Sequence, residues 1–463
     1  MLRFSRIAFV PILLAGCISN TIIDLDSVED PPIASGPMLG HVSDSSARVW
    51  LRLAAGASLD AYGHYRDRRY PPARIVDLNG GFRLVVFKGL PHDADFTVTL
   101  EVKTSARSSK RPGTTTQIAT VQGRTAPKPS TTGKVRLAFG SCSMASKFRY
   151  APIYEAIAFE KPDFAIYVGD NSYFVVGNGN WRTWGPDGDW SSPERMIRRH
   201  MDVRNNPYGR RLYASVPAYA TWDDHDYGPN NADRTFVGRH DALRVFKQVW
   251  ANPAYGTPET PGVFSSFRHG PVEVFLMDDR YHKYVATRDH PDVSDEDAVI
   301  WGRGQLEWLM DGLKKSTAPV KIIANGTQVI SQTERGEGHF QEAPAERKRL
   351  FDFLNANKIG GIVFLSGDRH FSELMRLDQG GGAAIIEFTS SPLQQNQQVG
   401  ALERNHPTNQ WALRGNTYGL VTIDIPSAGA GQITFEARND GNQLIVIDDT
   451  EMKTTVPLDD LYY

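Results

Sequence analysis

Four apolar runs, each followed at once by residues that can bind a metal ion, constrain the fold of this chain more than any other feature. The runs VRLAFG, DFAIYV, AYATW and GIVFLS lead into SCSM, GDNSY, DDHD and GDRH, respectively. Continuous apolar runs of this length predict strands that are buried on both faces, as in parallel sheets. Helical patterns separate several of the runs, so we expect an α/β domain in which the carboxyl ends of the strands meet.

The remaining elements of this domain follow from the same patterns. Buried strands are predicted at 218–222, 272–277, 320–324 and 361–366. Amphipathic spacing predicts helices at 150–160, 239–250, 304–315 and 345–355. The segments TYGLVTIDI, QITFEAR and NQLIVID near the C-terminus predict a return to antiparallel strands.

A chain of 463 residues is too long for one hydrophobic core, because single cores stop growing at roughly 250–300 residues. Residues 36–125 carry six or seven short alternating runs between turn residues, which predicts a small β-sandwich of immunoglobulin or fibronectin type. A linker rich in Pro, Ser and Thr follows at 126–134, and we assign 135–463 to the α/β domain.

The first residues are typical of an export signal. Arg3 and Arg6 precede a short apolar run that closes with Leu14-Ala15-Gly16-Cys17. The run is shorter than the roughly 20 apolar residues that span a bilayer. LAGC resembles the bacterial lipoprotein signal, which implies a signal peptide at 1–17, lipidation of Cys17 and a tether at 18–35. We therefore expect an exported protein, anchored by lipid on the periplasmic or cell-surface face of a bacterial outer membrane.

Composition excludes some classes of partner. Hydrophobic residues make up 40% of the chain, charged residues 22%, and the formal net charge is -2. These values are those of an ordinary globular protein. We expect no nucleic-acid-binding surface and a monomer.

The residues at the four strand ends predict a metal centre. Carboxylates that converge at this density repel one another unless a cation compensates them. Oxygen donors with an imidazole, a phenol and a thiol suit Fe, Mn, Ca or Mg better than a tetrahedral structural zinc site. The candidate residues are Cys142, Asp170, Tyr173, Asp223, Asp224, His225, Asp226, Asp368 and His370.

The series GDxxY, DDHD and GDxH resembles the calcineurin-like metallophosphoesterase superfamily, although Ser141-Cys142 stands where that superfamily usually has D-x-H. The combination FxSC, GDxxY, WDDH, MDDR and SGDxH resembles the alkaline phosphatase D (PhoD-like) family over about 36–448. This resemblance implies a layered β-sandwich flanked by helices, preceded by the small N-terminal sandwich.

The resemblance also implies roles for the candidate residues. Asp170 would bridge two metals, and Cys142, Tyr173 and His370 would complete a site for Fe³⁺. Asp224 and Asp368 would hold a second metal, often Ca²⁺, while Mn²⁺ or Zn²⁺ stay open as alternatives. Asp223 and Asn231 would be either further ligands or hydrogen-bond partners of ligands.

The activity implied is hydrolysis of a phosphate monoester or diester by a metal-bound hydroxide that attacks phosphorus. Asp170 and His225 would be catalytic, with His225 as a general acid or a phosphate contact. Arg369 would either contact phosphate or point to solvent, and Asp278 to Arg280 would form a buried structural ion pair. The alternative is a surface-anchored carbohydrate- or protein-binding lipoprotein with a structural metal site. Trp181, Trp184 and Trp190 would line the pocket or pack an irregular loop.

Overall fold

The fold is given by a computed structural model, which describes residues 31–463 apart from 106–113, 146–149, 175–187, 289, 333–336, 380–381, 396–408 and 428. The predicted leader with Cys17, and also Trp181 and Trp184, lie outside the described residues. No helix in the described part of the chain is long and apolar enough to cross a membrane.

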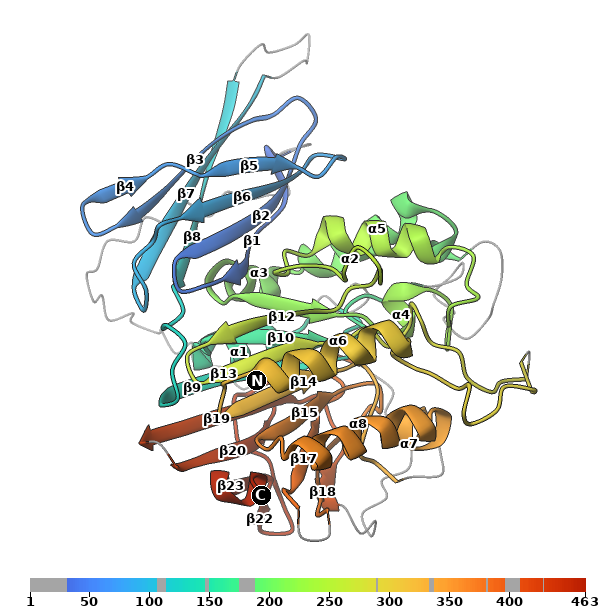
Figure 1. Ribbon diagram of the computed structural model, residues 1–463. Helices are drawn as coiled ribbons and strands as arrows, with labels where there is room; N and C mark the ends of the chain where they lie inside the picture. Colours follow the sequence, from blue (N-terminus) through green and yellow to red (C-terminus); the bar gives the residue numbers. More distant parts are fainter. Residues whose placement is uncertain are drawn as a thin grey trace, which may run out of the picture.

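The N-terminal part is a sandwich of two antiparallel four-stranded sheets, drawn in blue at the top of Figure 1. Its strands are β1 (Ile33–Val42), β2 (Ser46–Leu53), β3 (Ser58–Tyr65), β4 (Arg68–Tyr70), β5 (Arg74–Asp77), β6 (Phe82–Lys88), β7 (Asp95–Ser105) and β8 (Thr114–Arg124). The sheet orders are β1-β2-β6-β5 and β4-β3-β7-β8. Alternating apolar residues such as Val49, Leu51, Val98 and Leu100 face inward and form the core between the sheets.

The larger part is built on two stacked sheets. The six-stranded sheet has the order β11 (Ala218–Thr221), β10 (Phe164–Val168), β9 (Gly133–Gly140), β19 (Tyr418–Ser427), β20 (Ala430–Arg438), β23 (Lys453–Pro457). The seven-stranded sheet has the order β12 (Ser265–His269), β13 (Val272–Leu276), β14 (Val320–Ala324), β15 (Ile362–Ser366), β17 (Ile385–Thr389), β16 (Ser372–Leu377), β18 (Asn409–Leu413). Leu137 and Phe139 of the first sheet pack with Val274 and Val363 of the second in one shared core.

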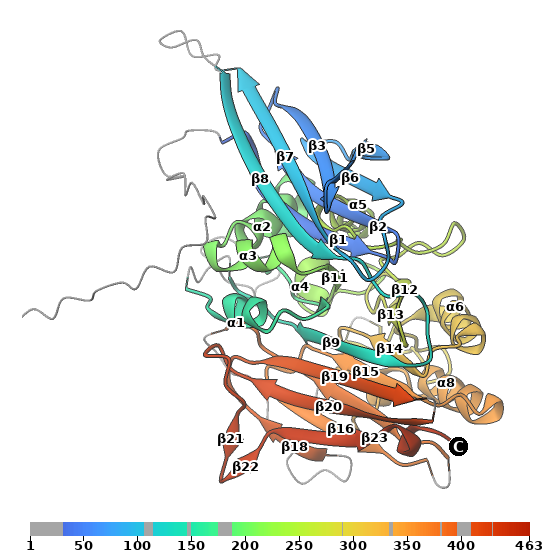
Figure 2. The same cartoon turned by 90° about the vertical axis from the view of Figure 1, so that its left-hand side faces the viewer.

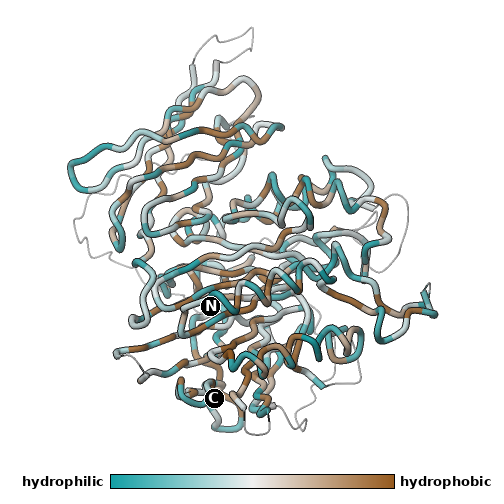
Figure 3. The backbone as a smooth tube through the Cα atoms, in the orientation of Figure 1, coloured by the Kyte–Doolittle hydropathy of each residue, from teal (hydrophilic) through white to brown (hydrophobic). Residues whose placement is uncertain are grey.

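Helices cover both outer faces of this pair of sheets, which makes a layered α/β fold (Figures 1 and 2). The helices are α1 (Ile153–Glu160), α2 (Pro193–Arg204), α3 (Pro207–Ser215), α4 (Asp224–Tyr227), α5 (Arg239–Val249), α6 (Gly302–Lys315), α7 (His339–Glu342) and α8 (Pro344–Asn357), with 3-10 turns η2 (Asp189–Ser191) and η3 (Leu458–Leu461). Apolar residues of α1, α2, α3 and α5 pack against the six-stranded sheet, and those of α6 and α8 pack against the seven-stranded sheet. Figure 3 shows the apolar stretches concentrated in the central strands.

The predicted helices and buried strands of this domain are present, with shifts of a few residues at their ends. The prediction for NQLIVID is wrong in extent, because only β21 (Val446–Ile447) forms there and pairs with β22 (Thr450–Glu451). Asp448 and Asp449 both adopt positive φ, the geometry of a tight hairpin turn. The chain therefore reverses early, and β23 takes the place beside β20.

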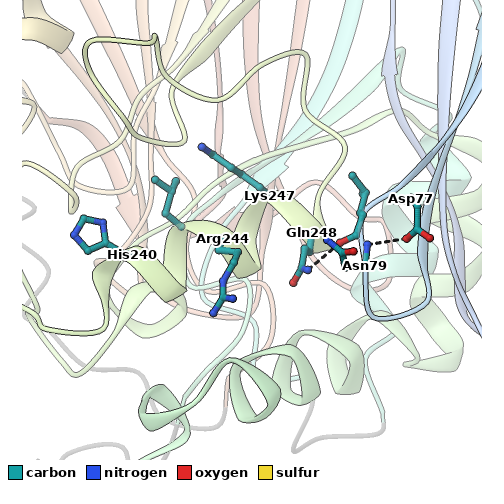
Figure 4. A pocket seen from close by; sticks show the side chains of 8 residues that line it. Asp77, Asn79, His240, Arg244, Lys247 and Gln248 are labelled. Carbon is teal, nitrogen blue, oxygen red and sulfur yellow. Dashed lines mark hydrogen bonds between the residues drawn. The ribbon is translucent and has the colours of Figure 1, made fainter.

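A buried cation joins the N-terminal sandwich to the α/β layers. The guanidinium carbon of Arg204 lies 5.1 Å from the ring centre of Trp50 in the sandwich, and 4.5 and 4.4 Å from those of Tyr213 and Trp250. A hollow of roughly 460 Å³ opens elsewhere on the same seam, between the loop at Leu78 and the outer face of α5 (Figure 4). None of the predicted metal ligands lines this hollow.

Candidate metal centre

The parallel strands of the two sheets deliver their carboxyl ends to one place. β9, β10 and β11 run parallel in one sheet, and β13, β14, β15 and β17 run parallel in the other. Glycines allow the loops to approach closely: a Cβ added to Gly169 would lie 2.5 Å from Cβ of Asp223, and one added to Gly367 would lie 2.5 Å from Cβ of Ser141. Both substitutions would therefore force the strand ends apart.

One group of candidate ligands surrounds a single carboxylate oxygen. Oδ2 of Asp170 accepts a hydrogen bond from the Tyr173 hydroxyl at 2.9 Å and lies 3.4 Å from Sγ of Cys142. The Tyr173 hydroxyl is 3.3 Å from Nε2 of His370. Ligand atoms of Cys142, Asp170 and His370 all lie within 4.8 Å of one another. A thiol, a carboxylate, a phenol and an imidazole therefore converge from three strand ends.

A second group lies on the other side of the same carboxylate. Ligand atoms of Asp170, Asp224 and His225 also lie within 4.8 Å of one another. The backbone N–H of His225 donates to Oδ1 of Asp170 at 3.2 Å, and the His225 ring stacks on Tyr173 with ring centres 4.5 Å apart. The backbone N–H of Asn231 donates to Oδ2 of Asp224 at 2.7 Å. Asp170 is thus shared by the two groups.

The donors fit bound cations because buried carboxylates are crowded together there and one of their oxygens lacks a proton donor. Oδ2 of Asp223 is buried and has no hydrogen-bond partner among the described residues. Burial, with Glu337 as the strongest of the neighbouring charges, raises the pKa of Asp368 to about 7. Burial and the carboxylates of Asp224 and Asp226 raise the pKa of Asp170 well above its ordinary range. A cation among these groups would remove both the burial penalty and the repulsion.

Four of the six predicted ligands adopt a left-handed backbone conformation. The φ angles are +58° at Cys142, +50° at Asp170, +64° at Asp368 and +53° at His370. Non-glycine residues rarely adopt this conformation, and such strain clusters at functional sites. The loops hold these side chains in place at a cost in backbone energy.

The imidazoles of the centre are held neutral. Burial lowers the pKa of His370 to about 4, with the nearby His225 as a further cause. Burial also lowers the pKa of His225, against the opposing effect of Asp224. A neutral imidazole keeps a lone pair available for a metal ion.

Arg280 links the centre to a buried ion-pair network. Its guanidinium is fully buried and pairs with Asp223 and with Oε2 of Glu337, the latter at 2.7 Å. Lys283 also contacts Glu337, at 2.8 Å. The prediction that the Asp278–Arg280 segment is buried and paired is confirmed, but the main partners of Arg280 come from other segments.

Three residues of the centre were assigned no role from the motifs. Asp226 accepts hydrogen bonds from the backbone N–H groups of Asp223 and Asn171, at 2.7 and 3.0 Å, and so ties two ligand loops together. Ser391 accepts a hydrogen bond from the His370 N–H at 3.1 Å, and Gln395 contacts Tyr173 and His370. Asp226 was identified as a member of the DDHD strand end, but its role in tying the loops together was not predicted. The segment around Gln395 carries no signal in the sequence.

The remaining predicted residues differ in whether their side chains reach the centre. The Asn231 side chain is exposed, so this residue contacts the centre through its backbone. The guanidinium carbon of Arg369 lies 5.5 Å from the Phe371 ring centre, and its charge acts on Asp368 and His370. Trp190 is buried in the core beside α2 and therefore packs the fold.

Comparison with known proteins identifies a family and similar folds. The family model of PhoD-like phosphatases matches residues 137–440. The alkaline phosphatase D of Bacillus subtilis (strain 168) is 26% identical over 286 residues, which are 54% of this chain and 48% of that protein, so the match spans about half the relative's length. A solved PhoD structure superimposes with a TM-score of 0.70 at 18% identity, over 93% of this chain and 90% of that one. The purple acid phosphatase PPD1 from yellow lupin seeds gives 0.63 at 12% identity, over 92% and 75%.

Proposed function

Because the chain belongs to the PhoD-like phosphatase family, we propose that it is a metal-dependent hydrolase of phosphoric esters. One observation carries the proposal: the Asp170 carboxylate is shared by two groups of potential ligands, one with Cys142 and His370 and one with Asp224 and His225. Two cations held a short distance apart are the usual machinery for displacement at phosphorus. The family match spans every one of these residues.

The donor chemistry suggests different ions on the two sides of Asp170. A thiol, a phenol and an imidazole beside the carboxylate suit Fe³⁺, whereas the carboxylates of Asp224 and Asp368 suit a hard ion such as Ca²⁺, with Mn²⁺ or Zn²⁺ as alternatives. When bound, such ions lower the pKa of a coordinated water and neutralise charge on the phosphoryl oxygens.

The protein's own residues would then position the ligands and the phosphoryl group. Tyr173 places its oxygen 2.9 Å from Oδ2 of Asp170, where both would face the same ion, and supports the His225 ring by stacking. Nε2 of His225 lies 3.9 Å from Oδ1 of Asp224, so the ring points toward the acids, where its N–H would donate a hydrogen bond to a phosphoryl or leaving oxygen. The positive charge of Arg369, which acts on the neighbouring Asp368, would also attract a phosphate group.

The proposal is tested by hydrolysis of an aryl phosphate monoester and of a bis-aryl diester. We expect the purified protein to release phenolate from at least one of them, and chelator treatment to reduce the rate by at least about 10²-fold, because acidified water and charge neutralisation are lost together. Release is followed by absorbance, and metal content by elemental analysis.

Restoration is the control for this experiment. The chelated protein should recover activity when Fe³⁺ and Ca²⁺ are returned together, and the monoester-to-diester ratio reports the substrate preference. If the protein carries two metal ions per chain but hydrolyses neither ester, the proposal is wrong and a structural metal site is favoured.

We also propose that the protein is exported and anchored by lipid at Cys17, on the sequence evidence of Leu14-Ala15-Gly16-Cys17. Replacing Cys17 by Ser should move the protein from the membrane fraction to the soluble fraction of the host and abolish incorporation of labelled fatty acid. Replacing Ser19 by Ala is the matched control and should leave both unchanged. If the Cys17→Ser protein still takes up label and sediments with membranes, the lipid anchor is wrong.

A further inference from the structure

Gln395 places an amide against the metal-facing atoms of two candidate ligands. Its side-chain Nε2 donates to the hydroxyl of Tyr173 and lies 3.1 Å from Nε2 of His370. Tyr173 in turn donates to Asp170, so its oxygen can only accept from the amide. The residue is 7% exposed and follows β17, beyond every motif that pointed to the centre.

The backbone around Gln395 is fixed on two sides. The N–H groups of Leu393 and Gln394 donate to the carbonyls of Ser141 and Cys142, at 2.8 and 3.3 Å. The N–H of Gln395 itself donates to Oδ1 of Asn416 at 3.0 Å. The backbone of this segment is therefore held beside the Cys142 loop, which keeps the Gln395 side chain within reach of the centre.

The lone pairs that Gln395 engages are those that a metal ion would take from Tyr173 and His370. A metal ion on Nε2 of His370 would take that nitrogen's single lone pair, so one N–H of the buried amide would lose its acceptor, which is unfavourable in a buried site. A ligand bound at the centre would supply a new acceptor. The proposed reaction delivers one at this point, namely a phosphoryl oxygen of the substrate.

We propose that Gln395 is a substrate-binding residue whose amide donates to a phosphoryl oxygen held at the metal centre. The inference rests on the proposed function, because it takes the ligand to be a phosphate group. A neutral amide suits this task, since it supplies donors without adding a charge to a site crowded by Asp170, Asp224 and Asp368. Its position beside Tyr173 and His370 puts the contact on the side of the centre that carries the thiol and phenol.

The test uses the metal-loaded protein and inorganic phosphate as the probe. Calorimetric titration should give a Kd for phosphate that is about 10- to 100-fold higher for Gln395→Ala than for the parent, the range expected for a lost hydrogen bond to a charged group. Gln395→Glu has the same shape but a carboxylate in place of the donors, and should bind phosphate more weakly still. Elemental analysis should show the parent's metal content in both variants.

Gln248→Ala is the matched control, because that amide also donates to a protein oxygen, Leu78 O at 2.9 Å, but at the distant domain seam. Its phosphate Kd should stay within twofold of the parent. The inference is overturned if Gln395→Ala binds phosphate as tightly as the parent, or if its weaker binding is accounted for by lost metal. If the parent binds phosphate in a Gln395-dependent manner but hydrolyses no ester, the proposed function fails while this contact stands.

Discussion

Replacing Asp170 by Asn should lower kcat/KM for an aryl phosphate by at least about 10³-fold and reduce the metal content of the purified protein. Removing a single preorganised donor from an active site typically costs about 10²–10³ in rate, and Asp170 serves both groups of ligands at once. The amide is neutral and offers one acceptor oxygen in place of two. The backbone should tolerate the change, because Asn adopts the left-handed conformation at φ +50° as readily as Asp.

Asp233→Asn is the matched control, since Asp233 is also a buried aspartate of the same domain, but caps the turn at Thr235 with a 2.8 Å hydrogen bond. We expect its activity to stay within about threefold of the parent. Single-turnover rates and elemental analysis should be measured on the same preparations. An Asp170→Asn protein that keeps a tenth of the parent activity would contradict the shared role of this carboxylate.

Replacing Arg280 by Met should lower the free energy of unfolding of the metal-free protein by about 3–5 kcal/mol, the usual cost of removing one partner from a buried ion pair. Its guanidinium is fully buried and pairs with Asp223 and Glu337. Methionine fills much of the same space but leaves Asp223 without its cation and Glu337 with Lys283 alone. Urea unfolding, followed by tryptophan fluorescence in the presence of chelator, measures the loss.

Arg303→Met provides the comparison on the surface. Arg303 pairs with Glu307 one helical turn away at 2.7 Å, but its side chain is 82% exposed. Pairs of this kind contribute about 0.3–0.5 kcal/mol. Similar effects of the two substitutions would show that the Arg280 network is as weak as a solvated pair.

The parts of the fold that could be predicted are those with a local signal. The runs before Cys142, Asp170 and Asp368 are mostly apolar because their strands lie between a second sheet and a layer of helices. Each run stops at the residue where the strand leaves the core. Since parallel strands end at the same edge, the sequence also indicated which acids would meet.

The unpredicted parts depend on contacts between distant segments. Glu337 lies 57 residues from Arg280, and Gln395 lies 222 residues from Tyr173, in loops without periodic patterns. The position of β16 between β17 and β18 likewise depends on which strand edges are left free after the parallel strands have paired. No pattern in the sequence around these residues distinguishes them from surface loops.

A left-handed backbone is found at Cys142, Asp170, Asp368 and His370. It places thermal stability and activity in conflict at these positions. Glycine adopts that conformation without strain, and at the two aspartates it would also remove a buried, repelling charge. A selection for thermostability alone would therefore favour glycine at these four positions. The proteins recovered would outlast the parent on heating and have lost the ligands that the loops are bent to hold.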